Sequence, residues 1–142
     1  MGLFRIFDIA SSSMSAQSVR LNTTASNLAN ANTVAGSAEG AYRSRQPVFQ
    51  TVLAGTAPGA ASLDPASAGV RVAGVVQTGA PPPRVYQPGH PSADAEGYVY
   101  MSNVNVVDEM VNMISASRSY ENSVEVMNTS KELLLRTLTL GQ

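Results

Sequence analysis

The 142-residue sequence contains no cysteine and no tryptophan. Without cysteine the chain forms no disulfide, no thiolate metal site and no cysteine nucleophile. Aromatic residues make up 6% of the chain, which is little for a large hydrophobic core. The formal net charge is −1, so no excess of positive charge indicates binding to nucleic acid or to an anionic membrane. Composition therefore removes cysteine chemistry and electrostatic binding of polyanions from the functions open to this chain.

Long hydrophobic runs are also missing. No stretch approaches the ~18 consecutive apolar residues of a membrane span. Near the N-terminus, Arg5 and Asp8 interrupt the apolar residues, which excludes the continuous core of a secretory signal peptide. Ile6 stands where an N-myristoylation motif requires serine or threonine. We therefore expect that a protein of this sequence, if it leaves the cytoplasm, does so with an uncleaved N-terminus.

Glycine and proline are absent from two long segments, residues 3–35 and 98–140. All eight prolines, and all glycines except Gly2 and Gly141, lie between Gly36 and Gly97. In a helix interior these residues cost about 1 and 3 kcal/mol respectively relative to alanine. The distribution predicts an α+β fold, with one long helix at each end and a small insertion of strands and loops between them.

The first of these segments carries large apolar residues at every seventh position, namely Phe7, Met14, Leu21 and Leu28. This spacing is typical of a coiled-coil seam. Asp8, or one of the serines at 11–13, is a candidate N-cap. The helix is expected to fade out through residues 30–33, because asparagine offers turn conformations that compete with the helix.

The second segment carries two rows with the same spacing. One row is Met110, Ser117, Val124, Lys131 and Leu138, and the other is Met113, Tyr120, Met127 and Leu134. Asn105 is a suitable N-cap, and the acidic residues of the following turn favour the helix dipole. Gly141 is a suitable residue for the C-terminal cap of this helix. A helix from Val106 to Leu140, about 35 residues long and without internal caps, indicates a coiled coil.

Both helices are therefore expected to pack as a coiled-coil-like pair. Ser117 and Lys131 occupy positions that a regular coiled coil fills with apolar side chains. One interpretation is a lone two-helix hairpin that tolerates these polar residues. The other is a polymer, in which the helix faces meet several neighbours and polar groups fix the register. We favour the polymer, since a lone pair of this polarity is only marginally stable.

The middle of the chain predicts a small β element. Residues 41–53 and 70–77 have the composition of strands, and 97–101 forms a shorter strand that leads into the second helix. Residues 54–69 are almost entirely alanine, glycine, serine and proline, which indicates a flexible loop. Such a segment is too small to enclose a deep substrate pocket.

A search for catalytic residues finds little. His90 is the only histidine, and it lies between glycine and proline with Asp94 and Glu96 nearby in the sequence. One histidine and two carboxylates on a loop are weak support for a general base or a metal ligand, so a structural role in a turn is favoured. No phosphate-binding loop or nucleophile elbow is present. We therefore predict no catalytic, cofactor-binding or metal-binding residues, and no enzymatic activity.

Several motifs resemble a known family. Residues 14–22 (MSAQSVRLN) and 25–33 (ASNLANANT) resemble the N-terminal motif of bacterial flagellar rod and hook proteins. Three further stretches resemble the members that form the proximal rod: the PGHP turn with GYV at 97–99, NVNVVDEM at 103–110, and MISASRSY at 113–120 running on to VMNT. The similarity covers nearly the whole chain and is weakest within 54–69.

The resemblance implies a structural role. Members of this family are exported by the flagellar type III apparatus and polymerise into the rod of the basal body, which crosses the periplasm and transmits torque. By this resemblance residues 1–35 and 104–142 form a helical inner domain, and 36–103 form an outer segment. The implied partners are copies of the chain itself, the rod proteins FlgB and FlgF-like relatives, the FliE adaptor, the membrane ring at the base, and the export apparatus.

The residues expected at the assembly interface are apolar and aromatic residues of the heptad rows, one further apolar residue of the second helix, and asparagines of the asparagine-rich motif. They are Phe7, Met14, Leu21, Asn22, Asn27, Leu28, Asn30, Met110, Met113, Ile114, Tyr120, Val124, Met127, Leu134 and Leu138. Two alternatives remain open: a free-standing helical hairpin that acts as a binding or adaptor module, and a different flagellar rod protein. Concentration-dependent assembly with rod partners would distinguish a rod protein from an adaptor.

Overall fold

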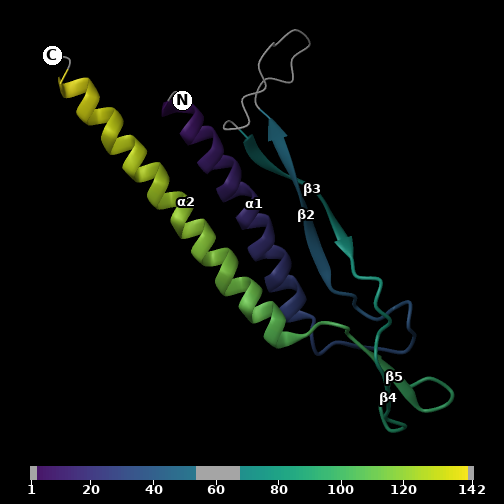
Figure 1. Cartoon of the computed structure of the whole chain (residues 1–142). Helices are drawn as coiled ribbons and strands as arrows, with labels where there is room; N and C mark the ends of the chain where they lie inside the picture. The colour runs from purple at the N-terminus through teal and green to yellow at the C-terminus, as the bar shows by residue number, and fades with distance from the viewer. Residues whose placement is uncertain (1–2, 54–67, 141–142) are drawn as a thin grey trace. The chain divides into compact units, whose positions relative to one another are not determined.

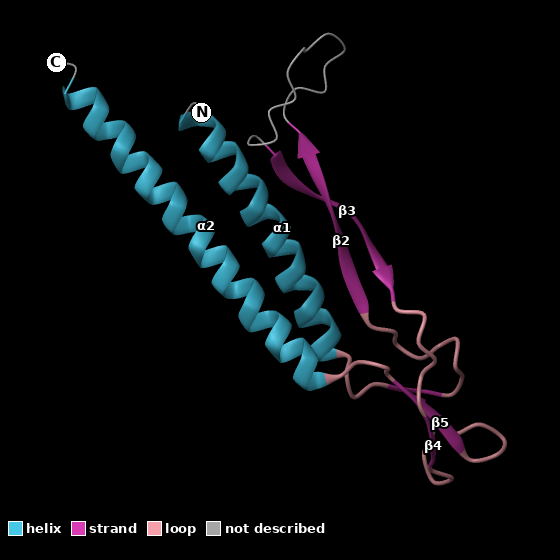
Figure 2. Ribbon diagram, in the orientation of Figure 1, coloured by secondary structure: helices cyan, strands magenta, loops and turns pink. Residues whose placement is uncertain are grey.

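The computed structural model describes residues 3–53 and 68–140 (Figure 1). The chain forms two compact units: unit 1 is Met1–Val19, Val48–Gly74 and Ser115–Gln142, and unit 2 is Arg20–Pro47 and Val75–Ile114. Helices, strands and loops are distinguished in Figure 2. The elements are α1 (Leu3–Ala29), β1 (Val34–Ala35), β2 (Arg45–Leu53), β3 (Ala68–Gln77), β4 (Arg84–Tyr86), β5 (Tyr98–Met101) and α2 (Val106–Leu140). The predicted α+β fold is confirmed.

Helix α1 begins earlier than its candidate N-caps. It is already helical at Leu3, so Asp8 and the serines at 11–13 are interior residues and the N-cap prediction was wrong. The helix extends this far because no glycine or proline interrupts residues 3–29. Its end was predicted correctly: Asn30 donates its amide to Ser26 O at 2.8 Å, and Thr33 Oγ1 donates to Asn30 O at 2.7 Å. The same two carbonyls also accept the backbone N–H groups of Asn30 and Thr33, so the asparagine and threonine side chains reinforce the turn that follows the helix.

Helix α2 has the predicted boundaries and the predicted cap. Asn105 Oδ1 accepts a hydrogen bond from the Val107 backbone N–H at 3.0 Å, which satisfies a donor of the first turn. Asp108 and Glu109 lie in that turn. Serines and threonines inside the helix donate back to its own carbonyls, for example Ser130 Oγ to Val126 O at 2.7 Å. The helix therefore carries many hydroxyls without requiring outside partners for them.

Unit 2 contains a three-stranded antiparallel sheet in the order β1–β5–β4. Val99 at the centre of β5 is fully buried and pairs with Val85 of β4. The strand at 97–101 was predicted, but β1 and β4 were not. Their two and three residues are too short to show an alternation of apolar and polar side chains. β1 and β4 are strands because their backbones pair with β5.

A second sheet consists of β2 and β3. Both strands were predicted, although β2 begins at Arg45 and β3 at Ala68. Arg71 donates to Gln50 Oε1 across the pair at 3.0 Å. Valines on both strands are exposed, as is Phe49. A two-stranded sheet is marginally stable by itself. The predicted loop between these strands lies outside the described residues, apart from Ala68 and Gly69, and so does Gly141.

In unit 1, the first part of α1 lies beside the last part of α2, and small residues fill the contact. Ala10, Ala16, Ala116 and Ser130 are buried. Ser13 and Ser123 join their hydroxyls at 3.0 Å. Because Ser123 already donates to Ser119 O, its single proton is used and Ser13 must be the donor. Small side chains thus bring the helix backbones close together.

The buried apolar residues among those described are few and small. Five of them are alanines and one is a valine: Ala10, Ala16, Ala31, Ala41, Val99 and Ala116. Burial of a whole large apolar side chain contributes about 1.5–3 kcal/mol, and alanine contributes much less. No helix in the described part of the chain has a stretch apolar and long enough to cross a bilayer. Both units therefore leave much of their apolar surface uncovered.

Candidate assembly surfaces

Asn27 is the centre of the polar network in unit 2. Its side chain is fully buried. The amide nitrogen donates to Arg45 O at 2.7 Å and to Ser44 Oγ at 3.3 Å. The amide oxygen accepts from Arg45 N at 2.9 Å and from Tyr42 Oη at 3.0 Å. All four hydrogen-bonding positions of this side chain are used, so Asn27 fixes the start of β2 onto α1.

Ser44 extends the network toward α2. Its backbone N–H donates to Asn103 Oδ1 at 2.7 Å, and its carbonyl accepts from Thr78 N at 2.8 Å and Thr78 Oγ1 at 3.0 Å. Asn103 in turn donates to Ala80 O at 2.8 Å. Four chain segments of unit 2 are therefore joined through side-chain amides and hydroxyls. Polar groups of this kind specify one arrangement when all of them are satisfied.

A polar cleft of about 150 Å³ opens beside this network in unit 2. Its lining consists of Ser44, Gln46, Thr78, Asn103, Asn105, Asp108, Glu109 and Asn112. Glu109 is 5% exposed, and Ser44 Oγ lies 3.5 Å from its Oε1. That distance is the long limit of a hydrogen bond. The buried carboxylate is therefore only weakly satisfied.

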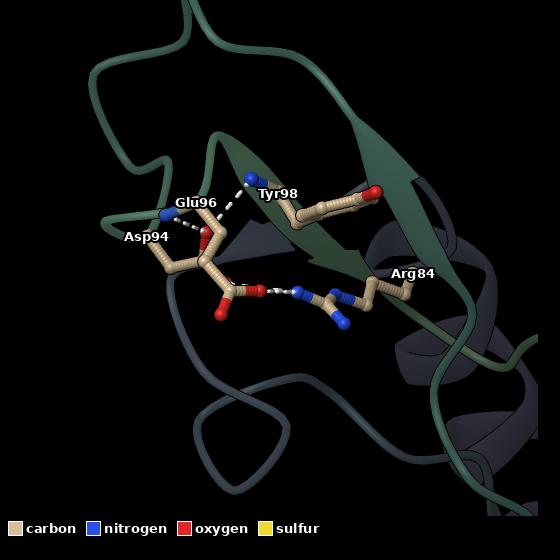
Figure 3. A network of polar contacts seen from close by, with 4 residues as sticks. All are labelled: Arg84, Asp94, Glu96 and Tyr98. Atoms are coloured by element: carbon tan, nitrogen blue, oxygen red, sulfur yellow. Dashed lines mark hydrogen bonds and ion pairs between the residues drawn. The ribbon is translucent and has the colours of Figure 1, made fainter.

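The hairpin formed by β4 and β5 carries a cluster of charged and aromatic side chains (Figure 3). Arg84 donates to Glu96 Oε2 at 2.5 Å, and its Nη2 lies 3.8 Å from Asp94 Oδ2. The guanidinium stacks over the Tyr98 ring at 3.8 Å from its centroid. Asp94 Oδ1 accepts from the backbone N–H groups of Glu96 and Tyr98, which closes the loop. These contacts stabilise the tip of the hairpin.

The hydrogen bond to Glu96 raises the pKa of Arg84 above its usual value, and burial opposes this effect. A basic group whose pKa is higher in the folded state than in the unfolded state stabilises the fold at pH values below its unfolded-state pKa. This contribution is lost as the pH rises through the folded-state pKa. For arginine this window lies far above physiological pH. The charge of Arg84 is therefore constant under all cellular conditions.

Gly97 precedes β5 and has a φ angle of +81°. A Cβ at this position would lie 3.1 Å from both Pro88 Cβ and Tyr86 Cε2. Replacing Gly97 by alanine is expected to lower the free energy of unfolding by about 1–2 kcal/mol, because left-handed backbone is unfavourable for a residue with a Cβ. Urea unfolding followed by tyrosine fluorescence measures the change. Gly89→Ala is the matched control, since a Cβ there meets nothing within 4 Å. Equal stability of the two variants would contradict the prediction.

His90 has the structural role that was favoured from its sequence context. Its Nδ1 accepts the Ser92 backbone N–H at 3.1 Å within the turn. Among the described residues no group of three or more histidine, aspartate and glutamate side chains is arranged to hold a metal ion.

Helix α2 exposes an apolar stripe in unit 2. Val107, Met110, Val111 and Ile114 are 67%, 52%, 61% and 56% exposed, and their spacing places them on one helix face. Unit 1 contains an apolar groove of about 410 Å³ lined by Ile6, Ile9, Ala10, Ser13, Asn122, Ser123 and Val126. Contiguous apolar surface of this kind is typical of interaction sites.

The residues predicted at the assembly interface fall into three groups. Asn22, Met110, Ile114 and Leu138 are exposed. Phe7, Met14, Leu21, Leu28, Asn30, Met113, Tyr120, Val124, Met127 and Leu134 are half-buried. Asn27 is buried inside its own chain and presents no surface to a neighbour in this conformation. For the other residues the interface stays a prediction.

Sequence reasoning missed Ser44, Asn103 and Glu109 as members of the polar network and cleft. Glu109 was read only as a favourable charge in the first turn of a helix. The available signal was the asparagine-rich composition on both sides of the insertion, because buried asparagine requires several partners. Which residues supply those partners depends on how the chain folds back.

Comparison with known proteins identifies two matching regions. Residues 7–36 match the family described as flagella basal body rod protein. Residues 95–140 match the family described as the C-terminal part of flagellar basal body rod FlgEFG proteins. Together the matches include most of α1, all of α2, and the two segments that carry Asn27 and Glu109.

Curated relatives match over the full length of both chains. The flagellar basal-body rod protein FlgC of Escherichia coli O6:H1 is 56% identical over 142 residues, with 100% of each chain covered. FlgC of Salmonella typhimurium is 55% identical over 142 residues. FlgC of Buchnera aphidicola from Acyrthosiphon pisum is 38% identical over 148 aligned positions, also with both chains fully covered.

Proposed function

This chain belongs to the FlgC family of flagellar basal-body rod proteins, and from that premise we propose that it polymerises through its terminal helices into the proximal part of the rod. As a rod protein it is a structural component of the flagellar basal body and not an enzyme. The family implies self-assembly with other rod components.

The observation that carries the proposal is the contrast between the buried and the exposed side chains. The buried apolar residues of the described chain are five alanines and Val99, whereas Val107, Val111 and Leu138 are more than half exposed. A chain with so small a core leaves most of its available hydrophobic stabilisation unused as a monomer. Packing of these faces against neighbouring subunits would recover it.

The proposal extends to the arrangement within the rod. Residues 1–35 and 104–142 would form the inner, axial domain, and residues 36–103 the outer segment. The half-buried seam residues Met14, Leu21, Met113 and Tyr120 would then complete their packing in the assembled tube. Coiled-coil-like helices resist twisting collectively when they are packed side by side, which suits an axle that transmits torque.

Specific neighbours follow from the position in the rod. We propose contacts with FlgB, with FlgF-like rod proteins, with the FliE adaptor and with the membrane ring at the base. Delivery would use the flagellar type III export apparatus without a cleaved signal peptide. Support comes from Arg5 and Asp8, which interrupt the N-terminal apolar residues, and from the absence of cysteine, which avoids stray crosslinks in an oxidising periplasm.

Deleting the gene and complementing the deletion tests the proposal. The deletion strain is expected to be non-motile, and its purified basal bodies should lack a completed rod in electron micrographs. The wild-type gene should restore both, and the protein should remain with detergent-washed basal bodies. A deletion strain that swims and builds complete rods would contradict a rod function and would favour the free-standing adaptor.

A further inference from the structure

Glu109 in the cleft of unit 2 has a carboxylate that no cation among the described residues neutralises. Glu109 is buried, with 5% of its surface exposed. Its contact with Ser44 Oγ spans 3.5 Å, and no ion pair joins Glu109 to another described residue. Burial of a charge is costly unless the charge is paired and hydrogen-bonded. The cleft therefore lacks a cationic partner.

Arg20 contacts the lining of this cleft, but its guanidinium binds an amide and not the carboxylate. Its Nη2 donates to Asn112 Oδ1 at 3.1 Å. Asn112 lies one helical turn after Glu109. The guanidinium of Arg20 therefore binds this amide and forms no ion pair with the Glu109 carboxylate. The cleft lining otherwise consists of amides, hydroxyls and the second carboxylate, Asp108.

The chemistry of the cleft favours a guanidinium over a metal ion. Calcium requires six to eight converging oxygen ligands, and no group of three acidic or histidine side chains in the described chain can hold a metal. A guanidinium presents five N–H donors in a planar fork, which suits one buried carboxylate surrounded by amide oxygens. Arginine is also the cation most suited to buried ion pairs at interfaces.

Arg118 is a cation that is available to a carboxylate of another chain. It is exposed on α2, and its guanidinium forms no hydrogen bond or ion pair with the described part of the chain. With Val107, Val111 and Ile114 it forms the series i, i+4, i+7 and i+11, which lies on one helix face. One face of α2 thus combines a free guanidinium with an apolar stripe. At protein interfaces an arginine anchor is commonly surrounded by apolar contacts in this way.

We propose that the Glu109 cleft of one subunit binds the Arg118 guanidinium of a second copy, an inference that rests on the proposed polymerisation. Nine residues separate the two positions, which at 100° per residue places them on opposite faces of α2 and about 13.5 Å apart along its axis. Arg118 therefore does not reach the cleft of its own chain. A donor and an acceptor on opposite faces give a head-to-tail contact, and such contacts propagate into open helical assemblies.

Carbodiimide coupling tests this contact in assembled rods. Arg118→Lys keeps the positive charge and supplies an amine that carbodiimide joins to a carboxylate in direct contact. In isolated basal bodies we expect covalent dimers whose crosslinked peptides join position 118 to Glu109. The same treatment of Arg118→Lys combined with Glu109→Gln is the matched control and should give no such peptide. Rods that contain the Arg118→Lys variant but no 109–118 crosslink would overturn the inference.

Motility provides the second measurement. Glu109→Gln and Arg118→Gln should each reduce swimming at least tenfold, whereas the exposed-charge controls Glu125→Gln and Arg136→Gln, which lie outside the cleft, should stay within twofold of wild type. The melting temperature of purified Glu109→Gln protein should be unchanged or higher, because the variant removes a buried charge. A melting temperature lowered together with motility would indicate a purely internal role for Glu109 and overturn the inference.

The two proposals fail in different ways. If the wild-type protein is present in basal bodies and restores motility, the proposed function stands, and absence of the 109–118 crosslink contradicts only the contact. If the wild-type protein is absent from basal bodies, both proposals are wrong.

Discussion

Replacement of Asn27 by alanine is expected to lower the free energy of unfolding by roughly 3 kcal/mol or more. The substitution removes four hydrogen bonds, to Ser44 Oγ, Tyr42 Oη and both backbone groups of Arg45. A buried polar group left without a partner costs about 1–3 kcal/mol, and the site is closed to water because Asn27 is fully buried. Several groups lose their partner at once, so a loss comparable with the stability of a small domain is expected.

Urea unfolding followed by tyrosine fluorescence measures this loss, since Tyr42, Tyr86, Tyr98 and Tyr100 all belong to unit 2. Asn22→Ala is the matched control: it lies in the same motif on the same helix, and its side chain is exposed. The control should change the free energy by less than about 0.5 kcal/mol. In a deletion strain we expect Asn27→Ala to fail to restore motility. An equal loss of stability in the two variants would show that burial of Asn27 does not determine its contribution to the fold.

The helices could be predicted from the sequence because their signals are local. The absence of glycine and proline set their extent, and Asn105 set the start of α2 through a hydrogen bond to a residue two positions away. The start of α1 was misplaced for the same reason. Serines at 11–13 resemble a cap by composition, but composition does not exclude a helix that already runs through them.

The contact between the helices could not be predicted in the same way. The heptad rows of large residues suggested that Met14, Leu21 and Met113 make the pair, yet they are only half-buried. The buried positions are small or polar, such as Ala16 and Ala116. Small residues permit the closest approach of two backbones, but alanine and serine are also common on exposed helix faces. Sequence alone does not distinguish these two uses.

The assembly surfaces depend on this difference. Small residues make the helix contact in unit 1, and the large side chains of the heptad rows remain half-buried or exposed. In unit 2 the stripe at Val107 and Ile114 is exposed. Part of the apolar pattern that predicted pairing is therefore accessible on the surface of each unit. This agrees with the polymer interpretation of the seams and gives it a structural reason.

Replacement of Ala116 by leucine is the second change with a large expected effect. Ala116 is fully buried in unit 1, where α1 and α2 lie side by side and Ala16 is also buried. Leucine adds three carbon atoms at a position with no exposed surface, so the helices must separate or the side chain must adopt a strained rotamer. Overpacking of this kind costs about 1–3 kcal/mol. The variant should melt at a lower temperature in far-ultraviolet circular dichroism.

Ser115→Leu is the matched control, because the adjacent side chain is exposed and leucine is a better helix former than serine. It should leave the melting temperature unchanged or slightly raised. The comparison separates the size of residue 116 from hydrophobicity and from helix propensity, since both variants introduce the same side chain on the same turn of α2. Equal melting temperatures would mean that the small-residue contact does not hold the helices together, and the heptad rows would then be the contact within the chain. A lower melting temperature for Ala116→Leu alone would support contacts between the heptad rows and the neighbouring subunits of the rod.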